Sequence, residues 1–66
     1  MNAEQVTRIA TEVCTAKELD ALARHLAGHH HDNIALELGI SRRAVQARIE
    51  NAQRKITSHY HPTEAA

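Results

Sequence analysis

The chain contains neither Phe nor Trp, and Tyr60 is its single aromatic residue. A 66-residue chain without these large side chains must build its core from Leu, Ile, Val and Ala. Cores of this size rarely supply more than about 3–5 kcal/mol of stability. We therefore expect one small domain that is either marginally stable or supported by a partner, such as DNA or a second copy of the chain.

Cysteine and long apolar runs are also scarce. Cys14 is the only cysteine, so an internal disulfide is excluded, and the chain is compatible with a reducing cytosol. No apolar run is long enough to span a membrane, and no signal peptide is visible. We therefore expect a cytoplasmic protein without membrane contact.

The charged residues cancel overall but are unevenly distributed. Residues 1–40 carry three basic and six acidic side chains, whereas residues 41–66 carry five basic and two acidic ones. A net charge of zero argues against strong non-specific binding to nucleic acid, which depends on Lys and Arg neutralising phosphates. The basic C-terminal part is nevertheless suited to contact DNA.

The spacing of apolar residues predicts an all-α fold of four helices, at about residues 3–13, 16–27, 32–38 and 42–57. The last three form a tri-helical core to which the first is added, so residues 1–57 make one domain. Residues 58–66 lack helical periodicity and contain Pro62, which predicts a flexible tail.

The first two predicted helices form a scaffold. Asn2 can cap the first, whose apolar face is Val6, Ile9, Ala10 and Val13. A T-x-x-E capping box, Thr15 and Glu18, begins the second, and Gly28 ends it. Its predicted apolar face consists of Leu19, Leu22, Ala23 and Leu26. Cys14 is expected at the junction as a small apolar residue.

The last two predicted helices have the layout of a helix-turn-helix, in which the second helix lies in the DNA major groove. Gly39 can take the left-handed conformation that ends a helix, Ile40 can fill the corner, and Ser41 can cap the next helix. Apolar residues at helical spacing form the inner faces: Ile34, Ala35 and Leu38 on the first helix, and Val45, Ile49, Ala52 and Ile56 on the second.

The opposite face of residues 42–57 carries the candidate DNA contacts. Because N-terminal residues of a recognition helix approach base edges, we expect base reading by Arg43, Gln46, Ala47 and Glu50. Arg can donate two bonds to guanine, Gln can pair with adenine, Glu can accept from cytosine, and Ala can touch a thymine methyl. Phosphate contacts, which set register, are expected from Ser41, Arg42, Arg48, Asn51, Arg54 and Lys55. The alternative is an ordinary solvated helix face.

A pattern extends over residues 15–56: Thr15-Ala16-Lys17-Glu18, Leu22, Ile34-Ala35, Leu38-Gly39-Ile40-Ser41, Val45, Arg48-Ile49, Ala52 and Arg54-Lys55-Ile56. It resembles region 4 of bacterial sigma factors, especially the extracytoplasmic-function type, and is equally similar to the LuxR-type DNA-binding domain. The resemblance implies DNA binding in transcriptional control. The chain departs from it at His30, where such families often have a capping Ser, and at Glu50, where the sigma pattern usually has a basic or polar residue.

Histidines cluster at residue 25 and at residues 29–31. His25 and His29 would share a metal on one continuous helix, but Gly28 should end that helix before His29. Asp32 is the only nearby carboxylate, so we predict no metal site and no cofactor. We interpret His29–His31 as a polar turn near the DNA backbone. Protonation there would add positive charge near phosphate and strengthen binding below neutral pH, which a flat pH series of affinities would contradict.

These observations predict sequence-specific binding of double-stranded DNA in transcriptional regulation. A homodimer on a two-fold site is expected, joined through the exposed side of the first helix or the end of the last. Two alternatives stay open: a DNA-architectural or recombination accessory protein of the directionality-factor type, and a protein-binding module that contacts RNA polymerase or another regulator. An enzyme is not predicted, because no paired acid and base or nucleophile constellation emerges.

Overall fold

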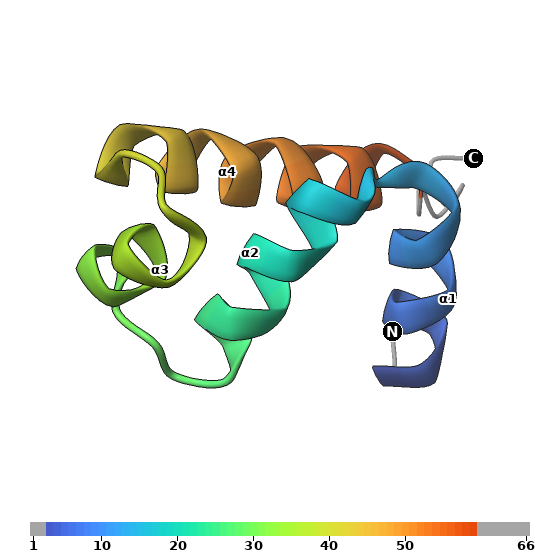
Figure 1. Cartoon of the computed structure of the whole chain (residues 1–66). Coiled ribbons are helices and arrows are strands. Elements are labelled where there is room, and N and C mark those ends of the chain that lie inside the picture. The colour runs from blue at the N-terminus through green and yellow to red at the C-terminus, as the bar shows by residue number, and fades with distance from the viewer. Residues whose placement is uncertain (1–2, 60–66) are drawn as a thin grey trace.

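The computed structural model describes residues 3–59, which form four helices and no strand: α1 (Ala3–Val13), α2 (Ala16–Leu26), α3 (His31–Leu38) and α4 (Arg42–His59). The all-α fold class is therefore confirmed. Helix α4 runs along one side of the molecule, with α3 beside its N-terminal half, α1 near its C-terminal end and α2 between them (Figure 1). No helix in this part of the chain is both long and apolar enough to cross a bilayer.

The core lies where α4 meets the other three helices. All four residues of its predicted inner stripe are buried, namely Val45, Ile49, Ala52 and Ile56. Ile34 of α3 is completely covered, and Ala10, Ala21 and Leu22 complete the buried cluster from α1 and α2. The buried apolar side chains are small to medium in size, and because α4 packs against each of the other three helices, it is the element that holds the domain together.

The buried face of α2 differs from the predicted one. Ala21 is completely buried and Glu18 almost so, whereas Ala23 is exposed and Leu26 is 69% exposed. The prediction that Ala23 and Leu26 face the core was therefore wrong. The apolar arc of α2 is wide, and α4 covers only the edge of it that includes Leu22.

Both glycines end a helix in the way that the sequence predicts. Gly28 has a φ of 100°, and the N–H of His29 donates to the carbonyl oxygen of Arg24 over 3.1 Å. Gly39 has a φ of 70°, and the N–H of Ile40 donates to the carbonyl oxygen of Ala35 over 3.0 Å. A positive φ at these two positions turns the chain sharply, which satisfies carbonyls that the helix end leaves unpaired.

The helix starts are capped unequally. The capping box of α2 is present: Thr15 Oγ1 accepts from the Glu18 amide over 3.2 Å, and the Thr15 amide donates to Glu18 Oε1 over 3.0 Å. Ser41 Oγ accepts from the Ala44 amide over 3.0 Å and so caps α4. His30 occupies the N-cap position of α3 but makes no side-chain capping bond there. A capping hydrogen bond is worth about 1 kcal/mol, so α3 begins without one source of stability.

Helix α4 is longer than expected. It continues to His59, two residues beyond the predicted end at 57, so Ser58 and His59 belong to the helix and not to a tail. Nothing at these two positions stops a helix, and Pro62 restricts only residues that lie further on. The predictions about Asn2, Tyr60 and the segment 60–66 fall outside the described residues.

Candidate nucleic-acid interface

The outer face of α4 is open along its length. Burying one stripe of the helix turns the opposite stripe toward solvent, and Arg43, Ala47, Glu50 and Arg54 are all exposed there. Among residues 3–59, Arg43 has no ion-pair or hydrogen-bond partner on its side chain. The guanidinium of Arg43 is therefore available to a ligand without the loss of an internal contact.

Gln46 and Glu50 are joined on one shoulder of this face. Gln46 Nε2 donates to Glu50 Oε2 over 3.0 Å, across one helical turn. The bond uses one of the two amide hydrogens of Gln46 and leaves its carbonyl oxygen and the other hydrogen for a further partner. It also gives the Glu50 carboxylate a partner within α4. Gln46 and Glu50, two of the four predicted base readers, therefore form one hydrogen-bonded unit.

The basic residues of α4 differ in their partners. Arg42 Nε lies 3.2 Å from Asp32 Oδ1 of α3, although both side chains are largely exposed. Arg54 Nη2 donates to Asn51 Oδ1 over 2.6 Å, within α4. Arg48 is half-buried on the other shoulder of the helix. An exposed ion pair contributes little to stability, so Arg42 can exchange Asp32 for another anion at small cost.

Lys55 is directed into the protein. Its Nζ lies 2.9 Å and 3.0 Å from the two carboxylate oxygens of Glu18, which is buried on α2. This hydrogen bond is the largest cause that lowers the pKa of Glu18 below its usual value, and the backbone bond from Thr15 is the next. Sequence spacing placed Lys55 on the flank of α4, but the pairing with Glu18 depends on how α2 and α4 pack. The ammonium that a phosphate contact would need is held by Glu18.

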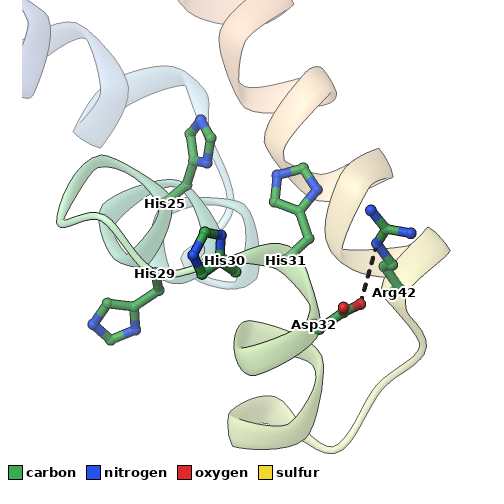
Figure 2. Close-up of a pocket in the computed structure, with 6 residues that line it drawn as sticks. All are labelled: His25, His29, His30, His31, Asp32 and Arg42. Atoms are coloured by element: carbon green, nitrogen blue, oxygen red, sulfur yellow. Dashed lines mark ion pairs between the residues drawn. The ribbon is translucent and has the colours of Figure 1, made fainter.

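The histidines line a shallow hollow of about 330 Å³ at the start of α3, together with Asp32 and Arg42 (Figure 2). The rings of His25 and His31 lie 5.2 Å apart between centroids and are tilted by 56°. His25 comes from the end of α2, and Arg42 comes from the first turn of α4. The hollow therefore gathers side chains from three helices close to the N-terminus of α4.

Sequence reasoning missed the contacts of Glu37, an exposed residue of α3. Glu37 Oε1 accepts from Arg24 Nη1 over 2.6 Å and lies 3.1 Å from His29 Nδ1. These contacts lower the pKa of the Glu37 carboxyl, chiefly through Arg24. Arg24 also pairs with Asp20 over 2.8 Å, so one cation joins α2 to α3. Helical spacing gives no sign of a contact between residues 13 positions apart.

The remaining candidate groups do not form a reactive centre within residues 3–59. Cys14 is half-buried between α1 and α2, and burial is the main cause that raises the pKa of its thiol. Its Sγ lies 3.8 Å from the carbonyl oxygen of Ala52. A raised pKa keeps the thiol protonated, whereas a nucleophile needs the thiolate. No group of three or more His, Cys, Asp or Glu side chains in this range has the arrangement of a metal site.

The family model described as bacterial regulatory proteins, luxR family (GerE), matches residues 12–64. The chain belongs to this family. No curated protein and no solved structure matches the chain.

Membership of the LuxR family makes the protein a helix-turn-helix DNA-binding protein of transcription regulation, and DNA is its partner. Proteins of this family are regulators and not enzymes. The LuxR-type resemblance is confirmed, while the similarity to sigma factor region 4 stays a prediction. The matched residues include α2, α3 and α4 and only the last two residues of α1, so α1 is mostly an addition to the family module.

Proposed function

We propose that α4 is the recognition helix and reads a specific duplex sequence in the major groove. The observation that supports this most directly is the division of α4 into a fully buried stripe and a fully open one. The buried stripe fixes the orientation of the helix. The open stripe presents Arg43 first, in the turn that a recognition helix brings nearest to base edges.

Base reading is assigned to Arg43, Ala47 and the Gln46–Glu50 unit. Arg43 can donate two parallel hydrogen bonds to guanine, and Ala47 can contact a thymine methyl. The hydrogen bond from Gln46 to Glu50 supports the Gln46 amide, which can still donate to and accept from adenine. Glu50 retains lone pairs that can accept from cytosine. Each good pair discriminates by about 1–3 kcal/mol against the wrong base.

Phosphate binding is assigned to residues at both ends of α4. Arg42 can exchange its exposed pair with Asp32 for a phosphate, and the Ser41 hydroxyl can donate outward while its oxygen caps the helix. Arg48, Asn51 and Arg54 extend the contact along the groove. Lys55 is the weakest member of the predicted set, because Glu18 already holds its ammonium. The histidine hollow beside Arg42 would face the same backbone.

We further infer that the active form is a homodimer on a two-fold DNA site, located with the DNA in the cytoplasm. One reading helix contacts few base pairs, and two copies on half-sites about one helical turn apart double the sequence that is read. Contact with RNA polymerase would follow from bound DNA at a promoter, and the exposed Glu4 and Glu12 of α1 provide an acidic surface for it.

The test is selection of bound duplexes from a random pool, followed by affinity measurements at two salt concentrations. Wild type should enrich one motif. Arg43→Ala should relax one position of it and weaken binding to the chosen sequence by about 1–3 kcal/mol. A pool that stays random after repeated selection with folded protein would overturn the proposal.

A matched control separates reading from positioning. Arg54→Ala removes the same type of side chain from the same face of α4, but about three turns further along. It should weaken all duplexes about equally and reduce the slope of log affinity against log salt by about one unit. If Arg54→Ala and Arg43→Ala change the selected motif in the same way, the assignment of base reading to the N-terminal half of α4 fails.

A further inference from the structure

An exposed apolar surface lies on one flank of α2, away from the α4 reading face. Two small and two large residues, at spacings of three, four and three, occupy one flank of the helix: Ala16, Leu19, Ala23 and Leu26. At 100° per residue they lie within an arc of about 80°. Ala16, Ala23 and Leu26 are exposed and Leu19 is half-buried, so this seam has no helix packed on it among residues 3–59.

A groove accompanies the seam. A hollow of about 200 Å³ opens between α1 and α2, lined by Val6, Thr7, Ala10, Thr11, Leu19, Leu22, Ala23 and Leu26. A second one of about 220 Å³ adjoins it and extends to Gln53, Ile56 and Thr57 of α4. None of these lining residues is charged, in a chain whose charged residues make up 24% of its length. Figure 1 shows α1 and α2 diverging on this side of the molecule.

From this geometry we propose that the α2 seam is the interface of a homodimer, in which α2 of one copy packs antiparallel on α2 of the other. A spacing of three and four residues is the repeat by which two helices interlock side chains. When α2 is reversed about Ala21, Leu19 faces Ala23 of the second copy and Leu26 faces Ala16. A large residue then meets a small one at every contact. A two-fold interface requires this kind of match, because the same surface of both copies must be complementary to itself.

The charges around the seam permit this pairing. The uncharged groove allows two identical surfaces to approach without repulsion. Asp20 is the acidic residue beside the seam, and Arg24 already neutralises it through a 2.8 Å contact. Each large residue of the seam lies opposite a small one when an identical copy is reversed on it. The partner that fits best is therefore a second copy of the chain.

The inference deepens the homodimer of the proposed function by naming its surface, and its test needs no DNA. Sedimentation equilibrium of the whole chain should show a dimer of twice the 7.3 kDa chain mass, in equilibrium with monomer. Leu26→Lys should weaken the dimer by about 100-fold, since each copy loses a buried leucine that contributes about tenfold. A wild type that stays monomeric at every concentration would overturn the inference.

Two variants together test the register. Ala16→Glu and Leu26→Lys each place a charge opposite an apolar residue of an identical copy, and each should be monomeric alone. Both charges suit the helix dipole, because residue 16 begins α2 and residue 26 ends it. Mixed in equal amounts, they should form a heterodimer with one Glu–Lys contact and one native Ala–Leu contact. A mixture that stays monomeric would refute the antiparallel register.

A control substitution makes the result specific. Leu36 of α3 is 82% exposed and is the other large hydrophobic residue exposed among residues 3–59. Leu36→Lys should leave the affinity of the dimer unchanged. If Leu36→Lys weakens the dimer as much as Leu26→Lys does, the assignment of the interface to the α2 seam is contradicted. A chain that dimerises but selects no duplex would sink the proposed function alone. A monomer that selects a half-site would refute this inference and the homodimer of the proposed function, but not the assignment of α4 as the reading helix.

Discussion

Replacing Glu18 by Gln should destabilise the domain more than such a small change in the side chain suggests. Gln keeps the shape of the side chain and one oxygen that can accept from the Thr15 amide, so the capping box can persist. The lost element is the charge that accepts from Lys55 Nζ at 2.9 Å and 3.0 Å. The Glu18 side chain is 11% exposed and that of Lys55 39%, so the pair is only partly screened by water.

A hydrogen bond to a charged group contributes about 1.5–3 kcal/mol, and we expect a loss of about 2 kcal/mol for Glu18→Gln at neutral pH. In a domain of this size this corresponds to a midpoint of thermal unfolding lower by about 8–16 °C. Circular dichroism during heating or urea unfolding measures it. Glu50→Gln is the matched control, since Glu50 is exposed and, within residues 3–59, its side chain pairs only with a neutral amide. The effect of this substitution should stay within about 0.5 kcal/mol.

The pH dependence of the stability difference between wild type and Glu18→Gln tests whether the Glu18 charge causes it. Lys55, and next Thr15, lower the pKa of the folded Glu18 carboxyl below its usual value of 4.5. Stability from this group is therefore present above pH 4.5 and is lost as the pH falls through the folded pKa. The gap between wild type and Glu18→Gln should close in that range. If the two proteins have the same free energy of unfolding at neutral pH, or if their difference persists unchanged in acid, the role given to the Glu18 charge is refuted.

Three further changes have definite outcomes. Gly39→Ala should lower the free energy of unfolding by about 1 kcal/mol, because φ at this position is +70°. An added Cβ meets no atom within 4 Å, so the effect comes from the backbone conformation. A urea midpoint equal to that of wild type would contradict this argument. His30→Ser should stabilise the domain by about 1 kcal/mol by supplying the side-chain cap that α3 lacks, again by urea unfolding. The Cys14 thiol should react with iodoacetamide more slowly than free cysteine at the same pH, and equal rates in the native protein would show that burial does not raise its pKa.

Local signals in the sequence were sufficient for the four helices and for most of their ends, although α4 extends two residues beyond its predicted end. The glycines at 28 and 39, the capping box of Thr15 and the cap at Ser41 each act through neighbours within five residues. The inner stripe of α4 was equally predictable, because a single run of apolar residues at helical spacing can turn only one way toward a core. These features depend on backbone geometry and local chemistry alone.

Contacts between helices were not predictable in the same way. Lys55 and Glu18 are 37 residues apart, and their pairing depends on how α2 crosses α4. The same crossing decides which edge of the wide apolar arc of α2 is covered, and so leaves Ala23 and Leu26 in solvent. Helical periodicity identifies an apolar arc but does not say how much of it a partner covers. The Gln46–Glu50 bond lies within one helix, but its spacing alone fits several rotamers.

The most direct test of the account is to map the surface of the protein that meets DNA. Amide chemical shifts of the ¹⁵N-labelled chain, recorded during titration with the selected duplex, report this residue by residue. The account predicts the largest changes at residues 41–50 of α4 and at the start of α3, with α1 little affected. Changes confined to α1 and α2, with the outer face of α4 unperturbed in a saturated complex, would contradict it.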